Sequence, residues 1–323
     1  MPRRVVVSTI SFGSVGGPTL ADNLAKARRL LEVACAARPD IICLPETFAS
    51  MQVTGRAAEL ALPVPGPAGE MAAEFARRHR TYIICPFLER ADGSVYNTAF
   101  LFDRQGEIVG AYRKVHPVTT TADYTELEDG VTPGRSPLVM QTDFGRIGIL
   151  ICFDIGFPES WAALKAEGAE IVFWPSAYNG GFPLQVYAGL HHYYVVSAVQ
   201  SDRPRFVDIN GQIILQGDRR SPVLTTTLDL EKGLYHTDFN ASQIEQILRK
   251  YGRDVTIRVS NDDGMFTLES CRDDLTVPQL EAEFGLERLE AYLARNQAVY
   301  DALAAGRHPT PQVTPYLDHQ QWV

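Results

Sequence analysis

Short segments of large apolar residues recur along the first part of the chain, and they constrain the fold more than any other feature. Residues 41–44, 146–151 and 171–174 have this character, which is typical of strands buried on both faces. Segments with helical periodicity lie between them, for example residues 20–35, which follow an expected N-cap at Thr19. Strands that alternate with helices predict an α/β protein.

Hairpins occur beside this alternation. Residues 205–209 and 212–216 predict a hairpin with a primed turn at Asn210 and Gly211, and residues 96–112 predict another. Strands found both in hairpins and in strand–helix units favour sheets covered by helices over a single doubly wound sheet.

The last part of the chain differs in character. Residues 277–305 combine helical periodicity with many charges, and residues 308–323 contain prolines and are irregular. No Gly/Ser-rich or Pro-rich linker interrupts the preceding sequence. We therefore predict one domain over residues 1–275, followed by a C-terminal helix and tail over residues 276–323 that pack on the domain or on a partner subunit.

Composition and charge exclude several classes of partner. The chain has 323 residues, 45% of them hydrophobic and 21% charged, which argues against disorder. The net charge is −9 with the two signs interspersed, whereas nucleic-acid binding needs a basic face. No segment approaches the roughly 20 apolar residues that span a bilayer. Five scattered cysteines without a CxxC pair favour a cytoplasmic location.

Glu46 is the first of three chemically active residues placed at the end of a predicted strand. The apolar segment 41–44 leads directly into Pro45 and Glu46. Burial disfavours the charged form of a carboxylate, and a carboxylate poised in this way can act as a general base. Taken alone, the segment is more typical of a surface glutamate in a strand-to-loop turn.

Lys114 and Cys152 stand in similar positions. A lysine at a strand end is usually solvated, but in a closed site its ammonium stabilises an oxyanion. Cys152 ends an apolar strand shortly before a helix expected to begin at Pro158. A thiol on such an elbow lies beside backbone N–H groups, as acyl transfer requires. The alternative for Cys152 alone is a buried core cysteine.

The three residues together, in this order, resemble the Glu–Lys–Cys triad of the nitrilase superfamily, the carbon–nitrogen hydrolases. The motifs that carry the resemblance are LPETF, YRKVHP and CFDIGFPE, with TPG and WPSAY segments between and after them. The resemblance covers roughly residues 5–230. It implies a four-layer α-β-β-α sandwich, a homodimer or larger homo-oligomer, and neither a metal nor an organic cofactor.

The resemblance also implies roles for the residues. Glu46 takes the thiol proton, Cys152 attacks the substrate carbon, and Lys114 and the backbone N–H of Phe153 hold the oxyanion. The family carries a second glutamate before its Pro-Gly element. Glu126 and Glu128 both qualify here, and we favour Glu128 because it lies nearer to that element.

The residues after the cysteine indicate a branch of the superfamily. True nitrilases usually carry Trp-Glu there, whereas this chain has Phe153 and Asp154, which resembles the amidase and carbamoyl-hydrolase branches. We therefore predict hydrolysis of a small-molecule amide or N-carbamoyl compound. Nitrile hydrolysis and a non-catalytic member of the fold are the alternatives. Asp154 is expected to order the elbow, and Tyr178 and Asn179 are expected near the site because they follow a strand end.

Two histidine-based hypotheses are weaker. His191 and His192 are adjacent and point in different directions on a helix, with no third ligand at helical spacing, so no metal site is predicted. A papain-like enzyme with His116 or His192 as the base is disfavoured, because Cys152 lies in the middle of the chain at the end of an apolar strand.

Overall fold

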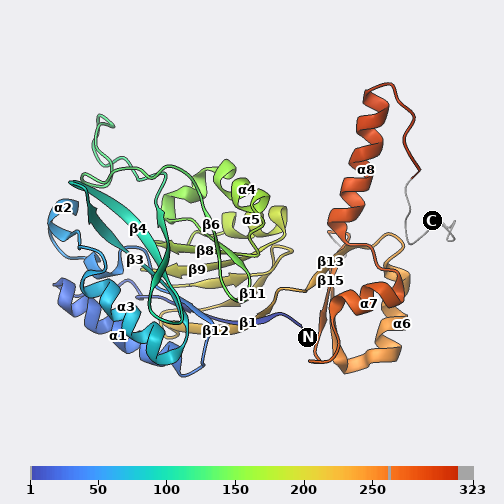
Figure 1. Cartoon of the computed structure of the whole chain (residues 1–323), viewed down its shortest axis with the longest axis horizontal. Coiled ribbons are helices and arrows are strands. Elements are labelled where there is room, and N and C mark those ends of the chain that lie inside the picture. Colours follow the sequence, from blue (N-terminus) through green and yellow to red (C-terminus); the bar gives the residue numbers. More distant parts are fainter. Residues whose placement is uncertain (1, 261–262, 312–323) are drawn as a thin grey trace. The chain divides into compact units, whose positions relative to one another are not determined.

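The computed structural model describes residues 2–260 and 263–311 (Figure 1). The chain forms two compact units, one of Val5–Leu228 and one of Asp229–Val323 together with Met1–Arg4. The predicted domain boundary at residue 275 falls inside the second unit and stays a prediction.

The larger unit contains two six-stranded sheets, ordered β12-β1-β2-β3-β4-β5 and β11-β10-β9-β8-β7-β6. The first sheet consists of β1 (Arg4–Ile10), β2 (Ile41–Cys43), β3 (Tyr82–Ala91), β4 (Ser94–Phe102), β5 (Ile108–Arg113) and β12 (Val223–Asp229). The second consists of β6 (Val139–Gln141), β7 (Arg146–Ile149), β8 (Ile171–Ser176), β9 (Tyr194–Val199), β10 (Arg205–Val207) and β11 (Ile213–Gln216). The strands β1, β2 and β3 pair in parallel, as do β7, β8 and β9. Because β2 and β8 are buried along their whole length, their sequences are apolar without alternation.

Helices cover the outer face of each sheet. The helices α1 (Leu20–Cys35) and α3 (Gly66–His79) pack against the first sheet, where Leu31 and Phe75 share one buried cluster with Ile83. The helices α4 (Pro158–Ala166) and α5 (Pro183–His191) cover the second sheet (Figure 1). The α-β-β-α sandwich is thus confirmed. Thr19 caps α1, since its hydroxyl accepts the Asp22 N–H at 3.2 Å.

The inner faces of the two sheets meet, and this arrangement positions the site. The buried Thr9 hydroxyl of β1 donates to the Ser197 carbonyl of β9 at 2.7 Å. The strands β2 and β5 of the first sheet run in the same direction, because β4 is antiparallel to both β3 and β5. Ligand sites commonly form at the carboxyl ends of parallel strands, and the residues after β2, β5 and β7 are those that the sequence singled out.

The second unit adds a small antiparallel sheet with helices. Its strands are ordered β13 (Gly233–His236), β15 (Met265–Ser270) and β14 (Val255–Ser260). The helices are α6 (Ala241–Tyr251), α7 (Val277–Phe284) and α8 (Leu289–Ala304). Tyr235, Ile247, Phe266 and Leu280 belong to its buried core. The expectation of one helix over residues 277–305 is wrong, because Gly285 takes a left-handed conformation (φ 62°) that ends α7.

The hairpin of β10 and β11 is confirmed, but its primed turn is wrong. A primed turn of this kind requires positive φ at both Asn210 and Gly211, and only Gly211 has it (φ 82°). The Gly211 N–H donates to the Asp208 carbonyl at 2.8 Å. The turn therefore begins at Asp208, whose carboxylate also accepts the Ile209 N–H at 2.8 Å.

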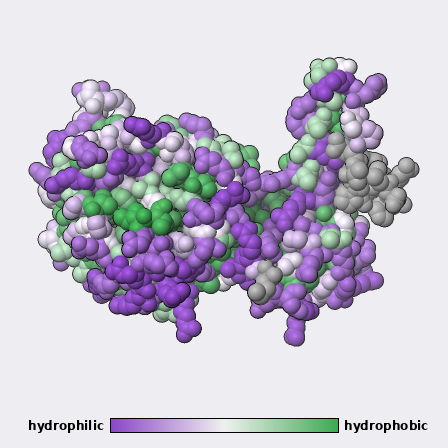
Figure 2. All heavy atoms as spheres, viewed as in Figure 1, coloured by the Kyte–Doolittle hydropathy of each residue, from purple (hydrophilic) through white to green (hydrophobic). Residues whose placement is uncertain are grey.

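The surface is mixed in polarity. On the face shown in Figure 2, hydrophilic side chains predominate, and apolar side chains gather on the larger unit between β4 and α4. Among the described residues, no helix is both long and apolar enough to cross a bilayer.

Candidate active site

A cleft of about 400 Å³ opens at the carboxyl ends of the strands in the larger unit. Glu46, Lys114 and Cys152 all line it, although they lie far apart in the sequence. The Glu46 side chain follows β2, Lys114 follows β5 and Cys152 follows β7. Lys114 is 1% exposed and Glu46 is 4% exposed. The structure therefore brings the three predicted residues together in one buried cluster.

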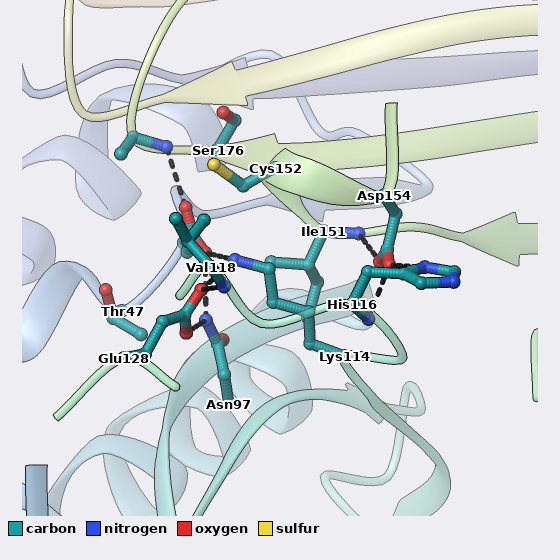
Figure 3. A network of polar contacts seen from close by, with 12 residues as sticks. Thr47, Asn97, Lys114, His116, Val118, Glu128, Ile151, Cys152, Asp154 and Ser176 are labelled. Atoms are coloured by element: carbon teal, nitrogen blue, oxygen red, sulfur yellow. Dashed lines mark hydrogen bonds and ion pairs between the residues drawn. The ribbon is translucent and has the colours of Figure 1, made fainter. Parts of the chain in front are cut away.

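Lys114 forms the centre of this cluster (Figure 3). Its Nζ donates to Glu46 Oε1 at 2.8 Å and also pairs with Glu128 Oε1. Burial by itself lowers the pKa of Lys114, but the negative charges around it, that of Glu46 first among them, raise the pKa above its ordinary value. The ammonium is thus held in its charged form between two carboxylates.

Asn97 joins the same two carboxylates. Its Nδ2 donates to Glu46 Oε1 at 2.8 Å and to Glu128 Oε2 at 3.1 Å. The other oxygen of Glu46, Oε2, accepts the Ala177 N–H at 2.8 Å, and Gln200 Nε2 donates to the Glu46 carbonyl at 2.6 Å. Donors from both sheets therefore fix the position of the Glu46 carboxylate.

Cys152 occupies a strained elbow between β7 and α4. Its φ of 48° lies in the left-handed region, which non-glycine residues rarely adopt and which is found at functional sites. Trp174 Nε1 donates to the Cys152 carbonyl at 3.0 Å. The Ser176 hydroxyl and the Ala177 N–H both act to lower the pKa of the thiol. The sulfur is therefore held where the strand ends at the cleft.

The thiol of Cys152 resists ionisation. Burial raises its pKa to about 12, and the charge of Glu46 contributes to the rise, while Lys114 acts in the opposite direction. At neutral pH the sulfur is therefore protonated. Because the thiolate is the effective nucleophile, attack on a substrate requires a base that removes the proton as the new bond forms.

Asp154 links the segment of Lys114 to the elbow of Cys152. Its fully buried carboxylate accepts the Tyr112 hydroxyl at 2.7 Å, the His116 N–H at 3.0 Å and the Ile151 N–H at 2.8 Å. Figure 3 shows this second network beside the first. Asp154 therefore ties the end of β5, where Lys114 lies, to the end of β7, where Cys152 lies.

Neither histidine proposed as an alternative base lines the cleft. The His116 ring bonds to Asp154 through Nδ1 at 2.8 Å and stacks on Phe157 at 3.5 Å between ring centroids. His192 Nδ1 lies 3.3 Å from the Ile209 carbonyl. These contacts disfavour the papain-like interpretation. Among the described residues, no three His, Cys, Asp or Glu side chains are grouped to hold a metal ion.

The two candidate second glutamates lie in different surroundings. Glu128 contacts Lys114 and Asn97, whereas Glu126 pairs with Arg56. Glu128 also accepts the Val118 N–H at 3.1 Å. Glu128 is therefore the one that lines the cleft.

The remaining candidate residues lie around the elbow. The Phe153 side chain is 42% exposed and that of Tyr178 is 44% exposed, and neither they nor Asn179 line the cleft. Burial raises the pKa of Tyr178, and its ring packs edge-on against Trp174 at 5.4 Å between centroids. Asn97 and Gln200 line the cleft but are absent from the sequence-based candidates.

The comparisons with known proteins agree with this fold. Residues 14–233 match the carbon–nitrogen hydrolase family. Omega-amidase NIT2 of Danio rerio is 30% identical over 164 residues, which cover 49% of this chain and 59% of that protein. Beta-ureidopropionase of Arabidopsis thaliana is 34% identical over 162 residues, 48% of this chain and 40% of that protein. The chain spans about half the length of the curated relatives it matches.

A solved structure shares the fold. Nit3 of Saccharomyces cerevisiae, a member of branch 10 of the nitrilase superfamily, superposes with a TM-score of 0.62 at 20% identity, covering 77% of this chain and 94% of that one. The fold and the cleft define an α-β-β-α protein with a cysteine, a lysine and two glutamates at one site. The family match covers more than half of the sequence, so the chain belongs to the carbon–nitrogen hydrolase family.

Proposed function

We propose that the chain hydrolyses a non-peptide carbon–nitrogen bond, in an amide or an N-carbamoyl group of a small molecule, with Cys152 as nucleophile. The observation that carries the proposal is the Lys114 ammonium, buried between two carboxylates in the cleft that also holds the thiol. The names of the relatives, an omega-amidase and a beta-ureidopropionase, support the amide and carbamoyl classes.

The first half of the reaction forms a thioester. Glu46 takes the thiol proton while the Cys152 sulfur attacks the carbonyl carbon. The Lys114 ammonium and the Phe153 N–H stabilise the negative oxygen of the tetrahedral intermediate. When the intermediate collapses, the carbon–nitrogen bond breaks, and the leaving nitrogen departs as ammonia or an amine with the proton that Glu46 held.

The second half releases the acid. Glu46 takes a proton from water as the water oxygen attacks the thioester, and the same donors stabilise the second oxyanion. The carbon–sulfur bond then breaks, and the proton on Glu46 returns to the sulfur. The sum converts a primary amide and water into a carboxylic acid and ammonia, or an N-carbamoyl compound and water into an amine, carbon dioxide and ammonia. Glu128 positions Lys114 and Asn97 throughout.

Ammonia release from three compound classes tests the proposed function. Primary amides, N-carbamoyl amino acids and nitriles are supplied separately to the folded protein, and ammonia is measured. We expect release from an amide or a carbamoyl compound. Release from nitriles but not from amides would favour nitrile hydrolysis instead, and no release from any class would favour a non-catalytic member of the fold.

The variant Glu46→Gln separates the role of the base from a structural role. We expect amide turnover to fall by roughly 10²–10⁴-fold, the typical contribution of a general base. Alkylation of Cys152 by iodoacetamide at alkaline pH should become faster, because the negative charge of Glu46 helps to raise the thiol pKa, and its removal increases the thiolate fraction. A fall in both amide turnover and the alkylation rate would contradict the assignment of Glu46 as the base. Cys152→Ala supplies the background alkylation rate.

Two matched variants test the second glutamate. Glu128→Gln should lower kcat by roughly 10²-fold, because Lys114 and Asn97 lose a shared partner and misplaced groups cost about that much. Glu126→Gln, which removes the same charge two residues away, should leave kcat close to the wild-type value. Steady-state kinetics would reverse the assignment if the Glu126 variant were the inactive one.

A further inference from the structure

We propose that the cleft selects amides or N-carbamoyl compounds that carry a positively charged amino group, and that Asp129 binds this group. The inference rests on the proposed function and names its substrate class. Four features of the cleft carry it: its charge balance, the position of Asp129, its excess of hydrogen-bond acceptors and its apolar wall.

The charge balance of the cleft is negative. Three carboxylates, those of Glu46, Glu128 and Asp129, line it together with a single ammonium, that of Lys114. The ammonium is already paired with two of these carboxylates. No lining cation is therefore left to pair with a substrate carboxylate. The whole chain also carries a net charge of −9, which disfavours the approach of anions.

Arg56 flanks the cleft in sequence, because its neighbours Gly55 and Ala57 both line it. Its guanidinium is paired with Glu126 on the loop that precedes Glu128. The charge of Arg56 is thus neutralised by a residue that does not line the cleft. An anionic substrate would have to compete with Glu126 for this arginine.

Asp129 is fixed in place with its carboxylate available. Its side chain forms no ion pair or hydrogen bond with the residues that the structure describes. The backbone is held, since the Asp129 N–H donates to Thr120 Oγ1 at 3.2 Å and the Glu128 N–H to the Val118 carbonyl at 2.8 Å. Both Glu128 and Asp129 have positive φ, 41° and 57°. The loop thus places an unpaired carboxylate directly after the glutamate that contacts Lys114.

The cleft offers acceptors in excess of donors. The side-chain amides that line it donate inside the protein: Gln52 Nε2 to the Ser14 carbonyl at 3.2 Å, and Gln200 Nε2 to the Glu46 carbonyl. Asn97 Nδ2 donates to the two glutamates. The side-chain amides are thus engaged inside the protein, while the Asp129 carboxylate has no partner among the described residues, which favours a ligand with N–H donors.

The cleft also has an apolar wall. Its residues are Met51, Leu60, Leu88 and Val118. A short aliphatic chain fits such a wall, with its amide carbonyl at Cys152 and its ammonium at Asp129. A substrate with a carboxylate in the place of the ammonium would be repelled by Asp129, and no lining cation would compensate. Such repulsion of the wrong substrate contributes to specificity.

Three amides that differ only in their terminal group test the inference. These are 5-aminopentanamide, hexanamide and 5-carboxypentanamide, which end in an ammonium, a methyl and a carboxylate group. We expect kcat/KM to fall in that order, with the ammonium preferred over the methyl by roughly fivefold, the upper range for an exposed ion pair. Asp129→Asn should remove most of this ratio, and Asp129→Lys should move the preference to the carboxylate.

Asp123→Asn is the matched control, because it removes the same charge from the same loop at a residue outside the cleft lining. It should leave the ratio unchanged. Equal turnover of the three amides, or a preference that survives Asp129→Asn, would overturn the inference while leaving the proposed hydrolysis intact.

Binding separates this inference from the proposed function. Calorimetry with Cys152→Ala measures the affinity for the same three compounds without turnover. Preferential binding of 5-aminopentanamide that is lost on adding Asp129→Asn would support the charge selection, even if the wild-type protein released no ammonia. Absence of binding, or tighter binding of the methyl or carboxylate compound, would overturn it.

Discussion

Replacing Lys114 with methionine is expected to destabilise the protein by roughly 3–5 kcal/mol, the usual cost of removing one partner from a buried ion pair, and to abolish turnover. Methionine has a similar length but no charge, so the carboxylates of Glu46 and Glu128 would face each other without the ammonium that now joins them. The same change removes the cation that stabilises the oxyanion. Chemical denaturation and ammonia release measure the two effects.

A second variant separates these effects. Lys114→Met combined with Glu128→Gln removes one of the two repelling charges, so part of the lost stability should return while turnover stays absent. A single variant as stable as the wild type would show that the buried ion pair contributes little to the free energy of unfolding.

Cys152→Ala should lower ammonia release by roughly 10⁴-fold or more, because the proposed acyl-enzyme forms on its sulfur. The change removes only one sulfur atom at a strained elbow, so the thermal unfolding midpoint should stay close to that of the wild type. Cys271→Ala, which removes an exposed cysteine of the second unit, is the matched control and should retain full activity. Release in the Cys152 variant at a tenth of the wild-type rate would exclude the thiol mechanism.

Much of the fold could be predicted because central strands such as β2 and β8 are short, apolar and buried along their whole length. The segments between them, some with helical periodicity and some forming hairpins, then indicated sheets covered by helices. The family resemblance of the strand-end motifs predicted the α-β-β-α arrangement. Other elements could not be found this way. The strand β12 contains three consecutive threonines at 225–227 and owes its place to pairing with β1. The small antiparallel sheet lies beyond residue 230, outside the part of the chain that the family resemblance covers.

The site residues that directly follow a strand could be predicted from the sequence. Those that reach the site from within another segment could not. Asn97 lies inside β4, and its sequence gives no sign that it faces Glu46, which is 51 positions away. The choice between Glu126 and Glu128 depends on the left-handed residues Glu128 and Asp129, a conformation that spacing alone does not reveal. The cytoplasmic location and the homo-oligomer stay predictions.

The acyl-enzyme is the most direct test of the account. The protein is mixed with a saturating amide, quenched in acid during turnover, digested and analysed by mass spectrometry. The account predicts that the peptide containing Cys152 gains the mass of the acyl group, and that the gain is absent from Cys152→Ala. Continued ammonia release without this adduct, or an acyl group on another residue, would contradict it.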